Sequence, residues 1–554
     1  MLETDCPTCK YPISNSRDSR LTSELQDSAI PPLNSLFVPN FGRIPIIKGD
    51  LTWISPNFLA ALREYVAILR PASIRICNGS VYEAQTLKDI IIKRQANLGI
   101  APLPEAIQQN PPEASVEDEI HIYSKTSEVS YSESLGIRYL TTSAYEASKS
   151  ERFEGSMMGR CLFVVPFAMG PIGGKFTQYA VQLTDDPVFV LNLRSIFRIS
   201  SAIWDAIAYT SPSRVIRSIH SIGLPRPVIR KNPQILPETL KPFLVVRNDE
   251  NEVWQFGSGF GRDSEKVSKF FGLTYSSRVG FKNGWHTLGA QIIKFTDSKN
   301  EIFYIIYCSQ TPLEKLEKAG WNIEISPFSI TWLNHRDGKF VAIQPENDEM
   351  LQVAKRDNFA KLFSKPEEYE IFSANPQDTK YGEFEVAAII FATTRRGDEK
   401  LPVVIETASW QEGVVLAAGA KDSPMRAKIA IEFSDFVAHW LQIPGLSQFP
   451  YTFLINFSDF WKEGKDNWRI FEWIFNRLKD PNDVSNANST PIGKLPKSLN
   501  IEGMENVKME NLTNVDVRFW LEELSKMAAF FKETMGPNKP KHIDQILADI
   551  SSKL

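Results

Sequence analysis

The stretch GSMMGRCLFVVPFAMGPIGGKFTQYAVQLTDDPVFVLNLRSIFRIS, residues 155–200, decides the fold of this 554-residue chain. Two short apolar runs lie in it, CLFVVPF at 161–167 and VFVLNL at 188–193. Apolar runs of this length, bounded by turn residues, predict strands that are buried on both faces. Similar runs at 302–307, 386–392 and 452–456 carry the same prediction into the second half of the chain.

Helical spacing marks two further segments. Ser55 and Pro56 predict the N-cap and first turn of a helix, and apolar residues then recur at helical spacing until Pro71. Between Phe519 and Phe531 large apolar residues repeat every three or four positions, which predicts an amphipathic helix near the C-terminus. Strands mixed with helices indicate an α/β protein.

Length and composition exclude several classes of protein. A chain of 554 residues exceeds what one hydrophobic core supports, so we expect two large domains. Hydrophobic residues make up 43% and no apolar run approaches the roughly 20 residues of a membrane span, which argues against an integral membrane protein. The net charge of -4 provides no basic surface for a phosphate backbone, so nucleic acid is not expected as a partner.

Cysteine usage indicates a reducing compartment. The five cysteines are an odd number, and the first residues carry no Arg-rich targeting stretch, so the cytoplasm is the expected location. Cys6 and Cys9 form a CxxC, which is half of a zinc site without a matching second pair nearby. We interpret these two residues as part of a flexible arm.

Residues 155–200 resemble a segment of the GTP-dependent phosphoenolpyruvate carboxykinase family. Further blocks resemble family segments and follow in family order: IIKGDL at 46–51, LRPASIRICNGS at 69–80, SIHSIGLP at 218–225, WQFGSGFGRDS at 254–264, IQPEN at 343–347, ETASWQEGV at 406–414, FEWIFNRL at 471–478 and STPIGKLPKSLNIEGMEN at 489–506. The resemblance implies a two-lobed α/β fold with mixed sheets and a cleft between the lobes. We expect a flexible arm at 1–44, a substrate-lobe-like domain at 45–283 and a nucleotide-lobe-like domain at 284–554.

The family is a lyase of gluconeogenesis that decarboxylates oxaloacetate and transfers a phosphoryl group from GTP. Its nucleotide loop reads FPSACGKTN, in which glycine, lysine and threonine cradle the phosphates and magnesium. Here the run IFYIIY leads into CSQTPLEKLEKAGW at 308–321, about five residues shorter and without GKT. Cys308 precedes the position of the family's loop cysteine and is interpreted as a buried strand-end residue, whereas Ser309 is a weak candidate substrate contact.

The family's metal ligands are mostly replaced. Lys269 matches the ligand lysine, but the histidine position is Gly289 and the two aspartate positions are Phe328 and Ser329. A phenyl ring cannot hold a cation, and a hydroxyl is a weak neutral ligand. His286 lies nearby in sequence, although the resemblance does not place it at the metal.

The substrate contacts are altered as well. His121 stands where the family has a carboxylate-binding arginine, so the permanent charge and the bidentate geometry are lost. Phe260 replaces a tyrosine, and Arg262 replaces a glycine in the same motif. Arg395 and Arg396 resemble an arginine pair of the family and are weak candidates for substrate binding.

Two segments that serve closure and base recognition are shortened. The family's lid and the segment after it correspond to AGAKDSPMRAKIAIEFSDFVAHW at 418–440, about half the family length. The family's guanine-stacking segment is reduced to DNWR at 466–469, with Asn467, Trp468 and Arg469 remaining.

These replacements favour a catalytically inactive family member with a regulatory or protein-interaction role, whose partner is another protein or an active relative. No cofactor is then expected. One alternative is a divergent carboxykinase that converts oxaloacetate and GTP to phosphoenolpyruvate, GDP and CO2 with manganese and GTP/magnesium. Another is a small-anion sensor that uses Arg262, Lys269, His121, Arg395 and Arg396.

Overall fold

The computed structural model describes most of both halves of the chain. The described residues are 34–98, 120–124, 137–170, 172–174, 177–194, 196–223, 242–247, 249–257, 267, 270–271, 285–309, 313, 316, 320–326, 329–336, 339–344, 383–394, 402–420, 450–457, 468–499, 513–535 and 539–554.

The chain divides into two compact units, as its length predicts. The first consists of Met1–Ser130, Arg138–Lys269 and Glu349–Asp378, and the second of Tyr131–Ile137, Phe270–Asp348 and Thr379–Leu554. The main division lies between 269 and 270. The expected boundary between 283 and 284 lies outside the described residues and stays a prediction. Each unit contains its own large sheet, so the α/β class with mixed sheets is confirmed.

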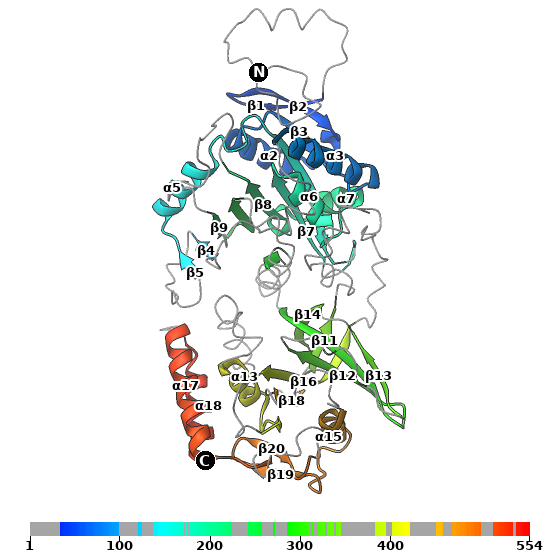
Figure 1. The fold of residues 1–554 in the computed structure, drawn as a ribbon, viewed down its shortest axis with the longest axis vertical. Helices are drawn as coiled ribbons and strands as arrows, with labels where there is room; N and C mark the ends of the chain where they lie inside the picture. Colours follow the sequence, from blue (N-terminus) through cyan, green and yellow to red (C-terminus); the bar gives the residue numbers. More distant parts are fainter. Residues whose placement is uncertain are drawn as a thin grey trace, which may run out of the picture. The chain divides into compact units, whose positions relative to one another are not determined.

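The first unit contains a ten-stranded mixed sheet (Figure 1). It contains both parallel and antiparallel pairings, for example β3 with β6 in parallel and β6 with β7 antiparallel. In spatial order the strands are β1 (Ser35–Val38), β2 (Gly42–Lys48), β3 (Ser73–Ile76), β6 (Cys161–Met169), β7 (Gln178–Thr184), β8 (Ile216–Ser221), β10 (Glu252–Phe256), β9 (Phe243–Arg247), β4 (Ile120–Tyr123) and β5 (Ile137–Tyr139).

Helix α2 forms where the sequence predicts it. The Ser55 hydroxyl caps the helix by accepting from the Phe58 N–H at 3.4 Å, and Pro56 occupies the first turn. Arg70 ends it in the left-handed conformation with φ of 55°. The helices of this unit are α2 (Pro56–Leu69), α3 (Val81–Leu98), α5 (Thr142–Phe153), α6 (Pro187–Arg194) and α7 (Ser201–Tyr209), with short 3-10 turns at Leu51–Trp53 and Pro212–Arg214.

The prediction of a strand at 188–193 is wrong, because these residues lie in helix α6. Pro187 begins the helix, and the Asp186 carboxylate accepts from the Val188 N–H at 3.0 Å. All eight residues of α6 are buried, so no polar face marks a helical period in the sequence. A short apolar run of this kind does not distinguish a buried helix from a buried strand.

The expected arm at 1–44 is too long at its C-terminal end. Strand β1 begins at Ser35 and pairs antiparallel with β2, which itself begins at Gly42. Leu36 and Val38 are buried in the core of the first unit, and this apolar contact fixes the segment on the sheet. The CxxC of Cys6 and Cys9 lies outside the described residues.

The second unit is built on another mixed sheet (Figure 1). In spatial order its strands are β12 (Ile302–Cys308), β11 (His286–Thr296), β14 (Ser329–Arg336), β15 (Lys339–Ile343), β16 (Phe384–Thr394), β18 (Tyr451–Phe457), β17 (Val404–Glu406), β20 (Gly493–Pro496) and β19 (Ala487–Thr490), and β13 (Asn322–Ile325) pairs with β11. Strand β12 also pairs with β16, which joins β12, β11, β14, β15 and β16 into a closed ring of pairings. The predicted strands at 302–307, 386–392 and 452–456 are confirmed as parts of β12, β16 and β18.

Helices cover both faces of the central strands in this unit. Alternation along β16 places Ile389 and Phe391 in one apolar cluster and Ile390 and Ala392 in another. The first cluster includes residues of α13 (Trp410–Gly419), α17 (Val517–Met535) and α18 (Lys541–Lys553), and the second includes residues of α15 (Trp468–Lys479). The predicted amphipathic helix near the C-terminus is therefore confirmed as α17.

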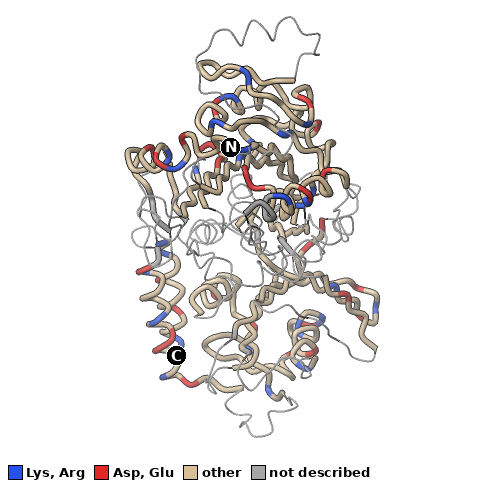
Figure 2. Tube along the Cα trace, turned by 45° about the horizontal axis from the view of Figure 1, so that its top comes forward, with Lys and Arg blue, Asp and Glu red and all other residues tan. Residues whose placement is uncertain are grey.

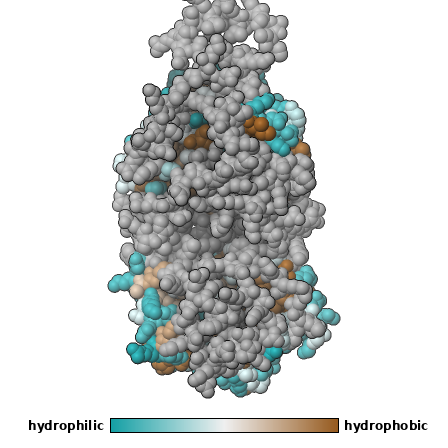
Figure 3. Space-filling model, viewed as in Figure 1, coloured by the Kyte–Doolittle hydropathy of each residue, from teal (hydrophilic) through white to brown (hydrophobic). Residues whose placement is uncertain are grey.

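The surface of the described residues mixes charges and apolar groups. Lysine and arginine are interspersed with aspartate and glutamate along the described chain (Figure 2). Brown apolar areas in Figure 3 are small and separate, and the exposed large apolar residues include Phe37, Tyr82 and Tyr209. Among the described residues, no helix combines the length and the apolar character that a membrane span requires.

Candidate functional site

Leu313, which follows β12 in the chain, is hydrogen-bonded to β11 through the side chain of Gln291. Its Oε1 accepts from the Leu313 N–H at 2.6 Å, and its Nε2 donates to the Leu313 carbonyl at 3.0 Å and to the Ser326 carbonyl at 3.0 Å. Gln291 is only 3% exposed. The resemblance predicts the family's phosphate cradle directly after β12. In this chain the Leu313 amide, which follows β12, is committed to an internal hydrogen bond.

Apolar packing holds the same segment. Leu313 and Leu316 belong to the apolar cluster that contains Ile293, Phe295 and Tyr307. A phosphate-binding loop needs backbone N–H groups that point at the ligand and a lysine that reaches it. Leu313 and Leu316 supply neither group, because both side chains are buried and the Leu313 amide is bonded to Gln291 of β11.

Ser309, the weak substrate candidate, lies directly after β12 and is buried. Burial raises the pKa of the Tyr307 hydroxyl, and a hydrogen bond with the Ser309 side chain opposes that rise. Cys308 is buried at the end of β12. The sequence interpretation of Cys308 as a buried residue at a strand end is therefore confirmed.

The structure places Gly289 and Ser329, two positions where the resemblance predicts replaced metal ligands, on adjacent strands. Ser329 pairs with Ala290 across β11 and β14, and Gly289 pairs with Ile330. Glycine has no side chain to offer a metal, and among the described residues no group of three or more His, Cys, Asp or Glu could hold one. His286, four pairs of residues from Ser329 on the same ladder, is buried and pairs with Leu333.

His121 lies half-buried in β4 of the first unit. Its Nδ1 is 3.3 Å from the Leu244 carbonyl, and its ring centroid is 4.9 Å from that of Phe243. The Arg152 guanidinium lies over the Phe243 ring, 4.8 Å from its centroid. The imidazole therefore contacts Phe243 and Leu244 of β9, and it does not take the place of a charged side chain that binds a carboxylate.

Trp468, the aromatic residue left from the base-recognition segment, begins α15 and packs inside the second unit. Its ring meets Trp321 edge-on at 6.3 Å, and the Arg469 guanidinium lies 4.9 Å from its centroid. Trp321 in turn contacts Phe475 at 5.3 Å. The indole is therefore part of an aromatic cluster of the protein itself.

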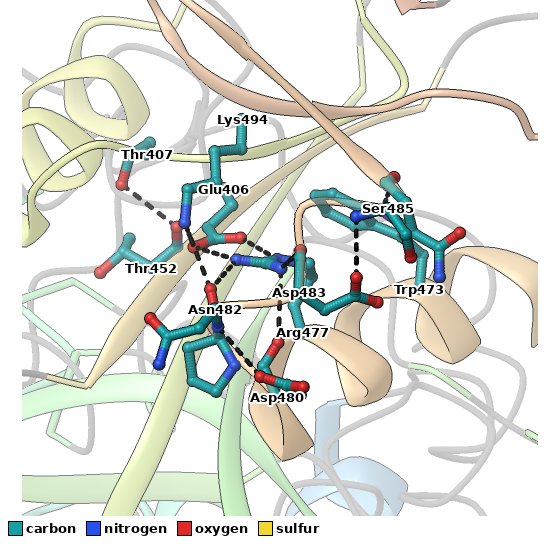
Figure 4. Close-up of polar contacts among 12 residues, drawn as sticks. Glu406, Thr407, Thr452, Trp473, Arg477, Asp480, Asn482, Asp483, Ser485 and Lys494 are labelled. Atoms are coloured by element: carbon teal, nitrogen blue, oxygen red, sulfur yellow. Dashed lines mark hydrogen bonds and ion pairs between the residues drawn. The ribbon is translucent and has the colours of Figure 1, made fainter.

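An ion-pair network that the sequence did not reveal joins β17, α15 and the β19–β20 hairpin (Figure 4). Glu406 is buried, and its carboxylate accepts from Arg477 Nε at 2.6 Å and from Lys494 Nζ at 3.3 Å. The remaining Arg477 nitrogens donate to the carbonyls of Pro481 and Asp483. The sequence feature that could have indicated this network is a glutamate at the end of an apolar run, VVIE at 403–406.

The other predicted site residues lie outside the described residues. They are Phe260, Arg262, Lys269, Phe328, Arg395, Arg396 and Asn467. Most of the shortened lid segment, 421–440, also lies outside them. Their roles stay predictions.

Comparison with known proteins completes the description of the site. A model of the phosphoenolpyruvate carboxykinase N-terminal domain matches residues 61–280, and a model of the phosphoenolpyruvate carboxykinase C-terminal P-loop domain matches residues 362–553. The chain belongs to the GTP-dependent phosphoenolpyruvate carboxykinase family. Between the two matched ranges lie residues 281–361, which contain Gly289, Gln291, Leu313 and Ser329.

Relatives in the phosphoenolpyruvate carboxykinase family align over nearly the whole chain. The GTP-type enzyme of Ascaris suum is 24% identical over 639 residues, covering 95% of this chain and 97% of the relative. That of Haemonchus contortus is 26% identical, covering 91% and 97%. The cytosolic enzyme of Gallus gallus is 24% identical, covering 92% and 97%.

Proposed function

We propose that this phosphoenolpyruvate carboxykinase family member has lost the carboxykinase reaction and acts through contacts with another protein, with an active relative as the first candidate. The observation that carries the proposal is the contact of Gln291 with Leu313. It commits backbone groups after β12 to the protein's own interior, where the reaction requires groups that bind the phosphates of GTP.

The size of the expected loss supports inactivity. Removing one preorganised charge-stabilising group commonly lowers a rate by a factor of about 10² to 10³. In this chain the cradle lysine, the metal ligands at 289 and 329 and the arginine at 121 are replaced together. Even with strong non-additivity, these losses leave little of the family's rate enhancement.

The same residues do not fit the cofactors of the family. Gly289 offers no ligand atom from a side chain, and the Ser329 hydroxyl is neutral. We therefore propose that the chain works without manganese or GTP/magnesium. The cytoplasm is its proposed location, because Cys77, Cys161 and Cys308 are buried thiols, as expected in a reducing compartment.

Thermal unfolding with and without GTP plus manganese tests the loss of the site. Ligand at about 100 times its dissociation constant adds about 2.7 kcal/mol, so an active relative run alongside should shift by several degrees. We expect no shift for this chain and no formation of phosphoenolpyruvate from oxaloacetate and GTP. A saturable shift together with phosphoenolpyruvate formation would establish the divergent carboxykinase instead.

The protein-interaction role needs a separate measurement. Purified chain and a purified active carboxykinase from the same organism would be mixed and examined by analytical ultracentrifugation, with activity of the relative recorded in parallel. A defined complex with altered relative activity is expected. Independent sedimentation with unchanged activity would exclude this partner.

A further inference from the structure

Several serines and threonines of this chain are followed directly by proline. They are Ser55, Ser211, Thr311, Ser326, Ser423 and Thr490. A hydroxyl in this position is what a proline-directed kinase phosphorylates, because its pocket accepts a next residue that has no backbone N–H. Such kinases also favour a cation three residues after the hydroxyl, since substrate selection rests on charge patterns. Ser211 has Arg214 at that position and Ser423 has Arg426, whereas the other candidates have no cation there.

The structure closes most of the described candidates to a kinase. Ser326 is 2% exposed, and its hydroxyl is bonded to the backbone of β11. Ser55 is half-buried, and its hydroxyl caps α2. The Thr490 hydroxyl donates to a carbonyl of its own β-hairpin at 2.6 Å. Thr311 and Ser423 lie outside the described residues.

Ser211 lies in an exposed connection between α7 and β8. Ser211, Pro212, Ser213 and Arg214 are all exposed, and Tyr209 just before them is 93% exposed. The Ser211 side chain makes no capping bond to the turn that follows, and its hydroxyl lies 3.0 Å from the Ser213 hydroxyl. Water can replace that bond at the surface, so the Ser211 hydroxyl is accessible to an enzyme.

The backbone around Ser211 already has the extended form in which kinases bind their substrate segments. Thr210 ends α7 with φ of -90° and ψ of 138°, and Ser211 has φ of -55° and ψ of 131°. The following proline disfavours the helical conformation of Ser211, so the sequence itself fixes this extension.

Only a short turn has to open for the rest of the segment to enter a kinase cleft. In the 3-10 turn Pro212–Arg214, the Arg214 N–H donates to the Ser211 carbonyl at 2.8 Å. The Asn251 side chain donates to the Ser213 carbonyl at 2.8 Å. Exposed hydrogen bonds of a three-residue turn belong to the least stable part of a fold, so local opening costs little.

We propose that Ser211 is a phosphorylation site of a proline-directed serine/threonine kinase. The Ser211 oxygen forms a bond to the γ-phosphorus of ATP, the bond from that phosphorus to ADP breaks, and the hydroxyl proton passes to the kinase's catalytic carboxylate. Arg214 is the cation that the kinase recognises. In a 3-10 turn residues three apart lie on one side, so the guanidinium is then next to the new phosphate and attracts it. The site does not depend on the loss of carboxykinase activity.

The full chain, incubated with a purified kinase of the cyclin-dependent class, ATP and Mg²⁺, tests the proposal. Trypsin releases residues 199–214 as one peptide, and fragmentation in the mass spectrometer assigns the phosphate to a single residue of it. We expect nearly complete phosphorylation of Ser211 and no phosphate on Ser55 or Ser326. A synthetic peptide of residues 205–219 is the positive control for recognition of the motif.

Variants made in an S423A background, where incorporated phosphate reports on Ser211, separate the parts of the motif. S211A should lose the phosphate. P212A should lower kcat/KM for phosphorylation by about tenfold or more, because alanine brings an N–H that would be buried in the kinase without an acceptor. R214M should lower it severalfold by removing the cation. S213A, the matched change at the neighbouring serine, should leave it unchanged.

The contrary outcomes are equally definite. Phosphorylation of the peptide but not of the folded chain would show that the folded surface does not present Ser211. Phosphate on Ser423, Ser213 or Thr210 with none on Ser211 would overturn the assignment of the residue. If P212A is phosphorylated as fast as its parent, or if the peptide is not phosphorylated at all, the proline-directed class of kinase is wrong.

Discussion

Gln291 holds the backbone of Leu313 through both atoms of its side-chain amide, at 2.6 Å and 3.0 Å. One polar side chain thereby fastens the segment after β12 to the neighbouring strand β11. Ser326 completes the arrangement, because its hydroxyl accepts from the Ile292 N–H at 2.7 Å. Leu313 and Ser326 are thus both tied to β11 by internal hydrogen bonds.

Substituting Gln291 by leucine should destabilise the second unit. Q291L keeps the volume but leaves the buried Leu313 amide and two carbonyls without their partner, and we expect a loss of about 2 to 4 kcal/mol. Urea unfolding followed by tryptophan fluorescence measures it. Q85L, at an exposed position of α3, should stay within about 0.5 kcal/mol of wild type. Equal stability of Q291L and Q85L would show that the hydrogen bonds of Gln291 contribute nothing to the stability of the second unit.

The Glu406–Arg477 pair should behave as a coupled unit. R477M leaves the buried Glu406 carboxylate with only Lys494 as a charged partner. We therefore expect the variant to lose about 3 to 5 kcal/mol of stability. The double variant E406L/R477M should cost less than the sum of the single variants, because no buried charge is left alone. Additive costs in a double-mutant cycle would contradict this interpretation of the network.

Acid should weaken the first unit through Glu252. Burial alone would raise the pKa of this carboxyl group, but Arg247 and the Tyr65 hydroxyl, 2.5 Å away, outweigh it and hold the pKa below the ordinary 4.5. The unfolded chain therefore takes up the proton first as pH falls. The stability from this group is fully present above about pH 5 and is lost as pH falls below 4.5 toward the folded pKa.

The variant E252Q tests this linkage. It should be less stable than wild type at pH 7, and the difference should shrink between pH 5 and pH 3 by at most about 1.4 kcal/mol per pH unit. Urea unfolding at a series of pH values measures the difference. E151Q, at an exposed glutamate of α5, serves as the control. A constant gap between E252Q and wild type across this range would refute the assignment.

Gly413 should tolerate no side chain. A Cβ at this position of α13 would lie 2.3 Å from Thr452 Cγ2 and 2.8 Å from Thr407 Oγ1, so helix and strand would have to separate. We expect G413A to cost about 1 to 3 kcal/mol despite the better helix propensity of alanine. Thermal unfolding of G413A and of the double variant G413A/T452S, which removes the nearest methyl group, measures the effect. If T452S restores no stability, the clash is not the cause.

Local signals predicted much of the fold. The cap of Ser55 and Pro56 and the apolar spacing to Leu69 define α2 because those interactions lie within one segment. The run 188–193 does not reveal its helix, because a helix buried on all sides shows no period that separates it from a strand. The sequence does not predict the contacts of Gln291 either. Its partners Leu313 and Ser326 lie 22 and 35 residues away, and no local pattern indicates them.

The sequence by itself determined the family, the α/β class and the absence of a GKT motif after the run IFYIIY, since each depends on residue types in order along the chain. Only the tertiary structure decided that Leu313 is bound to Gln291. It also revealed the network of Glu406 with Arg477. Hydrogen bonds and burial depend on which distant segments meet, and that information exists only once the strands have paired.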